Sequence, residues 1–437
     1  MDEIEQPKPK NVFRNRNFTL TFLGALVSNI ASLFYSFAVS FYILKITDNN
    51  AMIQGIYLAV SGSVFCIVTL FGGVISDRFN KAKIMYICDY LKGIVIIGFT
   101  LLLMFAIRSV EGQIAALFVV AVISNAIAAI FSPASSSLLP QIVEEESFQQ
   151  AQSYFSILSS FQSIIGIVLA GILYSVIPTD ILFLIVGVCY LLSGVSEMFI
   201  RYDGSGEKHD EKLTVKAVFA DIKDGFVYLK AIKSIVVMMG CILFINFFFA
   251  PLSENFLPYF VATDIAGTDY LFHETMEPEM WNAFLTMSWG IGSLVMGIVL
   301  SSIKQREKAN GMIRYSLLGT SLLLCVLVLF YALFQYGHIN INVLLIATTV
   351  IFLLLGGLIV LVNVPAGTAM MKIVEKDKFG KVSSVISIAS QGLVPIASVL
   401  GGVALTYLGS LGLISICAGG FLLTAVVLFF AKSVRDI

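Results

Sequence analysis

Long apolar runs alternate with short polar breaks along the whole chain of 437 residues. A helix needs about 20 mostly apolar residues to cross the hydrocarbon core of a bilayer. The runs reach that length twelve times and therefore predict twelve membrane-spanning helices. They cover approximately residues 18–44, 52–76, 84–107, 113–136, 149–176, 181–200, 234–260, 280–302, 312–336, 341–370, 382–408 and 411–431.

The composition agrees with a protein that lies largely in lipid. Hydrophobic residues make up 58% of the chain and charged residues only 13%, whereas soluble domains carry about 25% charged residues. The mean hydropathy is +0.92. We therefore expect an all-α membrane protein and exclude a soluble enzyme.

The positive charges divide unequally between the two ends of the predicted helices. Of the 27 Lys and Arg residues, only Lys45 and Arg108 fall on the side opposite the N-terminus. Because positive residues accumulate in cytoplasmic loops, this pattern predicts a multi-pass protein of the cell membrane with both termini in the cytoplasm.

The break after the seventh span instead carries five acidic residues and no Lys or Arg. We interpret it as an ordinary outer loop, with attraction of cations as the alternative. The five are Asp264, Asp269, Glu274, Glu277 and Glu279.

The longest polar stretch divides the spans six and six. Its second part alternates apolar residues with lysines at helical spacing, which predicts a helix lying at the membrane surface. We expect it to tether the two halves, with regulation as the alternative. The predicted parts are a cytoplasmic tail (1–17), a first half (18–200), a linker with an amphipathic helix (201–233), a second half (234–431) and a cytoplasmic tail (432–437).

The two halves resemble one another at an offset of 231 residues. The sequence Ile-Val-Glu occurs at 142–144 and again at 373–375, and Phe148 matches Phe379. Six-helix repeats joined by a central linker are typical of transporters with parallel repeats, whose substrate site lies between the halves. The pattern therefore predicts twelve helices in two pseudo-symmetric halves.

A distinctive loop follows the second span. Gly73, Asp77, Arg78 and Lys81 fit the Gly-x-x-x-Asp-Arg-x-Gly-Arg-Arg hallmark of the major facilitator superfamily, and the chain resembles that family. Asn80 replaces the usual glycine, and we expect it to keep the turn because asparagine tolerates a left-handed backbone. The resemblance implies the major facilitator fold and an ion-paired gate that locks one conformation. The alternative is a positively charged loop with an incidental aspartate.

Within this superfamily the chain is most similar to macrolide-efflux permeases and related bacterial exporters of drugs and siderophores. The similarity rests on the Asp77-Arg78 loop, on Asp89 in the third span, on Leu257-Pro258 and on Asn363-Val364-Pro365. It implies that Asp89 belongs with the gating motif.

Charges within spans are costly and are therefore functional candidates. Asp89 and Lys92 lie three residues apart and are expected to share a helix face, where they can neutralise each other. Glu197 lies one turn from the end of its span, near Arg201, and is interpreted as interfacial.

Glu254 is the exception, because no basic residue lies within helical reach and Pro251 and Pro258 flank it. Prolines free backbone carbonyls, which are tolerated in a membrane where they line a cavity. Poor hydration favours the neutral carboxyl, so we expect Glu254 to carry a coupling proton or to contact a cationic substrate. The alternative is a carboxylate at the outer water boundary.

The resemblance also implies that spans 1, 4, 7 and 10 line a central cavity. Amides and aromatic groups dominate its expected lining, which suits a bulky amphipathic substrate better than a small anion. The alternative is that these groups bond only between helices. The candidates are Asn29, Tyr35, Asn125, Gln162, Asn246, Asn255, Asn363 and Gln391.

The chain has no phosphate-binding Gly-x-x-x-x-Gly-Lys loop and no zinc motif, so we expect no ATPase activity, metal, cofactor or nucleic-acid partner. The leading hypothesis is a monomeric antiporter for efflux of lipophilic or macrolide-like compounds, as in multidrug resistance, with protons and membrane lipids as partners. The alternatives are a lipid or lysolipid translocase, a solute importer and a non-transporting sensor.

Overall fold

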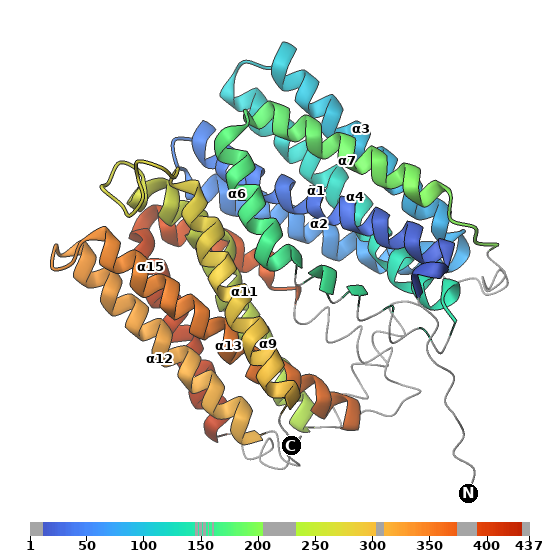
Figure 1. Cartoon of the computed structure of the whole chain (residues 1–437). Coiled ribbons are helices and arrows are strands. Elements are labelled where there is room, and N and C mark those ends of the chain that lie inside the picture. Colours follow the sequence, from blue (N-terminus) through green and yellow to red (C-terminus); the bar gives the residue numbers. More distant parts are fainter. Residues whose placement is uncertain are drawn as a thin grey trace, which may run out of the picture. The chain divides into compact units, whose positions relative to one another are not determined.

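The protein is helical throughout the part that the structure describes. The computed structural model describes residues 12–144, 147, 151, 154–155, 157–159, 161–203, 233–302, 310–373 and 391–430. Within these ranges eleven helices are long and apolar enough to cross a membrane, and no strand occurs (Figure 1). The predicted all-α membrane architecture is confirmed.

The first six spans are built around α1 to α7, with a 3-10 turn before them and a π-helix within them. These elements are η1 (Val12–Arg14), α1 (Arg16–Ile46), α2 (Ala51–Arg78), α3 (Lys81–Phe105), α4 (Val110–Ile142), η2 (Gln162–Gly166), α6 (Ile167–Val176) and α7 (Thr179–Met198). The later elements are α9 (Lys233–Ala250), η3 (Pro251–Phe256), α10 (Leu257–Phe260), η4 (Val261–Ile265), α11 (Glu279–Ser302), α12 (Asn310–Gln335), α13 (Ile341–Ile373) and α15 (Val394–Phe430).

The last helix accounts for the difference between eleven and twelve spans. α15 is interrupted at Gly409, whose φ of 67° lies in the left-handed region that glycine adopts without steric cost. This interruption falls between the predicted spans 382–408 and 411–431. The predicted amphipathic helix of the linker and residues 382–390 lie outside the described residues.

The helices form two compact units that do not follow the sequence halves. α1 and α2 each contribute one part to each unit. Unit 1 comprises Met1–Ser36, Ile67–Gln162 and Thr179–Lys212, and unit 2 comprises Phe37–Cys66, Ser163–Pro178 and Leu213–Ile437.

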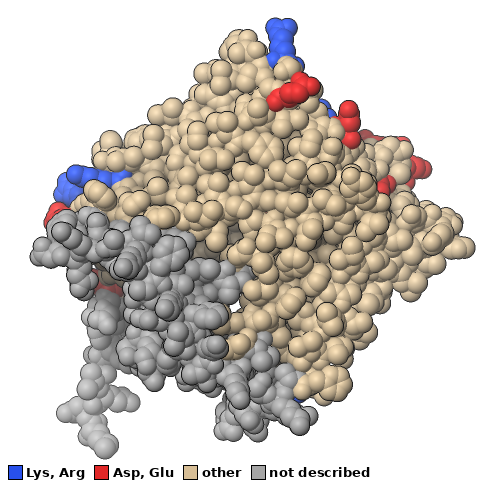
Figure 2. Space-filling view, turned by 180° about the vertical axis from the view of Figure 1, so that it is seen from behind, with Lys and Arg blue, Asp and Glu red and all other residues tan. Residues whose placement is uncertain are grey.

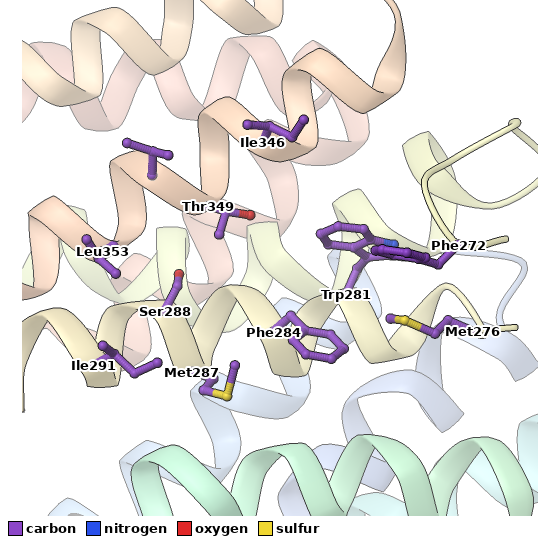
Figure 3. A pocket seen from close by; sticks show the side chains of 11 residues that line it. Phe272, Met276, Trp281, Phe284, Met287, Ser288, Ile291, Ile346, Thr349 and Leu353 are labelled. Atoms are coloured by element: carbon purple, nitrogen blue, oxygen red, sulfur yellow. The ribbon is translucent and has the colours of Figure 1, made fainter.

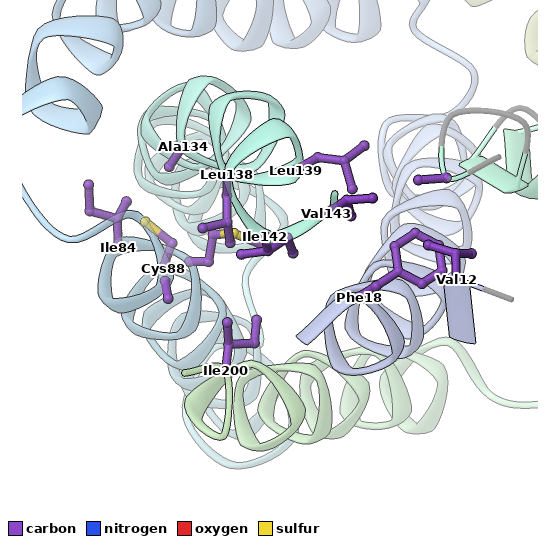
Figure 4. Packing of buried hydrophobic residues seen from close by; sticks show 13 residues of the cluster. Val12, Phe18, Ile84, Cys88, Ala134, Leu138, Leu139, Ile142, Val143 and Ile200 are labelled. Carbon is purple, nitrogen blue, oxygen red and sulfur yellow. The ribbon is translucent and has the colours of Figure 1, made fainter. Parts of the chain in front are cut away.

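In unit 1, α3 packs against α7 and α4. η1 and the start of α1 close one end of this bundle, where Val12 and Phe18 join a buried apolar cluster that includes residues of α3 and α4 and Ile200, which follows α7 (Figure 4). Asn17 and Arg201 are joined by two hydrogen bonds, because the amide of Asn17 donates to the Arg201 carbonyl at 2.7 Å and accepts from its N–H at 2.9 Å. Residues that precede the predicted first span therefore contribute to the packing of unit 1.

In unit 2, α11 packs against α13, and α12 packs against both α13 and α15. The crossing of α11 and α13 is tight, since a Cβ at Gly292 would lie 1.8 Å from the carbonyl oxygen of Leu353. A Cβ at Gly356 would likewise lie 2.1 Å from the Trp289 carbonyl oxygen. Small residues that allow such close approach are typical of helix contacts in membranes.

The visible face in Figure 2 is largely uncharged, with Lys, Arg, Asp and Glu near its edges. Large apolar side chains are also exposed, including Val176 and Phe430 at 75% and 74%. Apolar surface of this extent is expected against lipid rather than water.

Candidate transport site

The helix that carries Glu254 is irregular along much of its length. Regular α9 gives way to the π-helical segment η3 at Pro251, returns to one α-helical turn in α10 and becomes π-helical again in η4. Pro251 and Pro258 lack the N–H that would continue the regular bonding. Wider turns of this kind occur frequently at functional sites.

Two neighbouring polar residues of η3 have opposite environments. Glu254 is exposed, whereas Asn255 is fully buried. The Asn255 side chain donates from Nδ2 to the backbone carbonyl of Ser398 on α15 at 3.1 Å. Of the two, only Glu254 is therefore available to a proton or to a substrate.

Asn255 lies at a point where backbones from three elements approach one another. A Cβ at Gly55 of α2 would lie 2.5 Å from the Ser398 carbonyl oxygen, and one at Gly402 of α15 would lie 2.5 Å from the Ala51 carbonyl oxygen. We call this contact of α2, η3 and α15 the glycine crossing. It leaves no room for a side chain on either glycine.

The η4 segment is held by hydrogen bonds that join three elements of unit 2. The Ser410 hydroxyl donates to Oδ2 of Asp264 at 2.6 Å, and the Tyr331 hydroxyl of α12 donates to the same oxygen. We call these three residues the Asp264 cluster. The sequence placed Asp264 in an acidic loop, and its two partners lie too far along the chain to be found from local spacing.

The rest of the loop after η4 makes local contacts. Nδ1 of His273 lies 3.0 Å from Oδ1 of Asp269, and the Tyr270 hydroxyl donates to the Met276 carbonyl at 2.6 Å. Burial, together with Glu277 and Glu279 nearby, raises the pKa of Tyr270. This phenol therefore remains a hydrogen-bond donor in alkaline solution.

Asp89 lies on α3 beside α7, with 3% of its surface exposed. Lys92 does not form a close ion pair with it among the described side chains; its Nζ instead lies 4.5 Å from the centroid of the Tyr190 ring. Glu197 of α7 is fully buried, so its interpretation as an interfacial residue is wrong. The exposed neighbour Arg201 suggested a water boundary, but α7 turns Glu197 toward α1, where it packs against Gly24.

The loop motif is described only in part, because the side chains of Asp77 and Arg78 lie outside the described set. Asn80 has a φ of −56°, so the expected left-handed backbone is wrong. Its side chain instead caps α3 by accepting from the Lys83 N–H at 3.0 Å. Lys81 is buried, and a Cβ at Gly73 would meet no atom within 4 Å.

The other expected lining residues fall into three groups. Tyr35 and Asn255 form the first group, because both side chains are buried. Tyr35 packs against Phe183 with ring centroids 5.7 Å apart, and Asn255 lies at the glycine crossing. Half-buried side chains form the second group, and Asn125 among them donates to the Ala121 carbonyl of its own helix at 2.8 Å. The half-buried residues are Asn125, Gln162 and Asn246, and the exposed residues are Asn29, Asn363 and Gln391.

A pocket of about 400 Å³ lies between α11, α13 and the loop after η4, within unit 2 (Figure 3). Its walls are almost entirely apolar. The hydroxyls of Ser288 and Thr349 donate to carbonyls of their own helices at 2.7 Å. The indole Nε1 of Trp281 is buried and has no hydrogen-bond partner in the described part of the chain. The pocket is thus a largely apolar hollow, a feature that sequence analysis did not identify.

Comparison with known proteins agrees with the architecture. Residues 20–398 match the Major Facilitator Superfamily. The chain therefore belongs to this family of membrane transporters, and it is a transporter of small molecules rather than an enzyme.

Individual similarities are distant. The uncharacterized MFS-type transporter YkuC of Bacillus subtilis (strain 168) is 24% identical over 385 residues, covering 85% of this chain and 82% of YkuC. A point mutant of the nucleoside transporter NupG has a TM-score of 0.71 at 12% identity, covering 95% of this chain and 99% of NupG. A D-xylose–proton symporter has the same TM-score and identity, covering 98% and 100%. At such identities these structures establish the fold alone.

Proposed function

We propose that the protein exports lipophilic or amphipathic small molecules, including macrolide-like drugs, by alternating access coupled to proton antiport. It would act as a monomer in the cell membrane, surrounded by lipid, with both termini in the cytoplasm. Membership of the Major Facilitator Superfamily supports secondary transport. The orientation rests on the unequal distribution of Lys and Arg.

The apolar pocket of α11 and α13 is the observation that carries the choice of cargo. Its two hydroxyls already donate to backbone carbonyls of their own helices, and the rest of its wall is almost entirely apolar. Ligand pockets are mostly apolar, with few polar groups that fix orientation. A lipophilic molecule fits this description, whereas a sugar or an anion would leave its polar groups unbonded.

Besides the apolar pocket, exposed polar residues within the spans support a water-filled transport path. Glu254, Asn29 and Asn363 are exposed in helices that are otherwise apolar. Polar groups exposed at membrane depth are costly in lipid and usually face a bundle interior or an aqueous cavity. We assign Glu254 to the coupling proton or to a cationic group of the cargo, and the exposed amides, with Gln391, to the cavity wall.

Alternating access requires barriers that open and close. The glycine crossing supports a closed barrier at the end where α1 ends and α2 begins, which the proposed orientation places outside the cell. For the opposite end we propose the loop motif as the gate, with Gly73, Asp77, Arg78 and Lys81 in the loop. Asp89 would support this gate from α3. A two-state element of this kind can be biased by breaking its ion pairs.

Flux into proteoliposomes tests the proposal. A radiolabelled macrolide or a cationic dye is supplied with and without an imposed pH gradient, and the gradient is expected to increase accumulation. Glu254→Gln should reduce the gradient-driven part at least about tenfold, as expected for loss of a group that acts directly in coupling. Glu111→Gln is the matched control, because Glu111 is exposed in the first turn of α4. Equal gradient-driven flux in the two variants would remove Glu254 from the mechanism.

A lipid or lysolipid translocase is the alternative with structural support. Ile346 and Val350 of the pocket are 55% and 51% exposed, so the pocket opens at the apolar surface. A translocase would move a fluorescent lysolipid between leaflets in the same proteoliposomes and would show no macrolide accumulation. A solute importer would instead accumulate polar solutes in symport with protons.

A further inference from the structure

Two buried carboxyl groups lie together at the contact of α1, α3 and α7 in unit 1. Asp89 of α3 is 3% exposed and Glu197 of α7 is fully buried. Their negative charges interact with each other. The site belongs to one sequence half and lies on other helices than Glu254.

Hydrogen bonding does not compensate for the burial of these groups. Both oxygens of Glu197 and Oδ2 of Asp89 are buried without a hydrogen-bond partner in the described part of the chain. The Ser193 hydroxyl contacts Asp89, but it also donates to the Gly24 carbonyl at 2.9 Å. Since a hydroxyl has a single hydrogen, Ser193 cannot donate to both at once.

Glu197 is held tightly against α1. A Cβ at Gly24 would lie 2.9 Å from Cγ of Glu197 and 3.2 Å from its Oε1. The carboxyl group therefore faces the backbone of α1, and in the described part of the chain no side chain of that helix donates a hydrogen bond to it. An ionised carboxylate in such surroundings is strongly disfavoured.

One positive charge acts on the site in the described part of the chain. It belongs to Lys92, which acts on Asp89 while its Nζ rests on the ring of Tyr190. The Cys88 thiol of α3 and the Tyr190 phenol of α7 also lie at the site. α4 also packs against α3, and its one titratable side chain, Glu111, is exposed in its first turn.

We propose that Asp89 and Glu197 form a proton-binding site that holds one shared proton at neutral pH. With one proton the two carboxyl groups and Lys92 carry no net charge, whereas without it the site carries an uncompensated negative charge in the membrane. Two carboxyl groups that share a site cannot both ionise readily, and their titration belongs to the pair rather than to either residue.

Loss of the shared proton would leave both Asp89 and Glu197 negatively charged beside α1. This helix contributes residues to both compact units. Proton release therefore favours separation of α1 from α7 at Gly24, and proton binding favours their contact. Use of this site for coupling rests on the proposed proton-driven transport. The presence of the proton does not depend on that proposal.

Infrared spectroscopy of the full chain in lipid nanodiscs tests the proton directly, without a substrate. The wild type is titrated from mildly acidic to alkaline pH, and the carbonyl stretch of protonated carboxyl groups is followed. We expect a component that persists at neutral pH and is absent from the double variant Asp89→Asn/Glu197→Gln. The matched control Glu254→Gln should retain it. A wild-type spectrum without this component, or a double variant that retains it, would overturn the proposal.

Lys92→Met provides a second variant with an opposite prediction. Without the positive charge of Lys92, the site of Asp89 and Glu197 is neutral only when both carboxyl groups are protonated. The infrared signal of protonated carboxyl groups at neutral pH should therefore approximately double. An unchanged signal would contradict the charge balance. If the infrared component is present but flux shows no dependence on a pH gradient, the proton site stands and proton-driven export fails.

The pH dependence of thermal unfolding gives a readout that requires no spectral assignment. Exposed carboxyl groups of the unfolded chain lose their protons well below neutral pH, whereas the folded site keeps one. The folded state therefore binds more protons, and its stability falls as pH rises through neutral. Glu197→Gln should flatten this decrease relative to the exposed control Glu111→Gln, and an equally steep decrease in both would count against the site.

Discussion

At the scale of single residues, the glycine crossing makes a sharp prediction about space. In Gly402→Ala the new methyl group would meet the Ala51 carbonyl oxygen, where 2.5 Å is available. We expect a loss of about 1–3 kcal/mol, as for overpacking elsewhere, seen as a lower melting temperature in detergent. Gly419→Ala lies on the same helix with no atom within 4 Å of its Cβ and should be neutral. An equal effect of both would contradict the close contact.

Asn80 makes a second prediction at this scale, because it caps α3 instead of forming a left-handed turn. Asn80→Ala removes the bond from the Lys83 N–H and the bond to the Tyr202 carbonyl. The expected cost is about 1 kcal/mol, the usual value for loss of an N-cap. Asn80→Asp keeps the capping oxygen and serves as the control in the same melting experiment. A more stable Asn80→Gly variant would instead indicate a turn that prefers glycine.

The sequence identified Asp89 and Glu254 as unusual, because charged residues within long apolar runs are rare. It did not identify Glu197, since a carboxylate one turn from a helix end and near an arginine usually lies in water. Burial there depends on Gly24, a residue 173 positions earlier that leaves space for the side chain on α1. Such a contact is set by packing between helices, and periodicity along one helix does not reveal it.

At the scale of elements, the Asp264 cluster fixes the irregular end of the Glu254 helix. Ser410→Ala removes a 2.6 Å bond to a carboxylate, and bonds to charged groups contribute about 1.5–3 kcal/mol. We expect faster amide hydrogen exchange in η4 and a lower melting temperature. Ser415→Ala is the matched control, because in the described part of the chain the Ser415 hydroxyl bonds to the Leu411 carbonyl of its own helix and to no other group. Unchanged exchange in η4 would show that the cluster does not hold this segment.

Most element boundaries follow from hydropathy, because the length of a span is dictated by the thickness of the bilayer. The break before the last span was predicted and occurs at Gly409. The prolines around Glu254 indicated a loosened helix, but they did not specify two π-helical segments. Asp264 of η4 also bonds to Tyr331 of α12 and Ser410 of α15, which lie 67 and 146 residues further along the chain and cannot be found from local sequence.

At the scale of the whole molecule, the sequence predicted the family and the helical membrane fold, and both are confirmed. The arrangement into two six-helix halves remains a prediction, and the compact units cut across it because α1 and α2 belong to both. The apolar pocket was not predicted, since its walls come from α11, α13 and a loop whose apolar residues are indistinguishable in sequence from lipid-facing ones.

The central claim is that movement of a lipophilic cargo is tied to movement of protons in the opposite direction. The most direct measurement follows luminal pH in proteoliposomes with an enclosed pH-sensitive dye after a macrolide or cationic dye is added outside. Antiport predicts that cargo entering the vesicle expels protons, so the luminal pH rises, and that protein-free vesicles show no such rise. A fall in luminal pH would indicate symport, and cargo entry through the protein without a pH change would show that transport is not coupled to protons; either result contradicts the account.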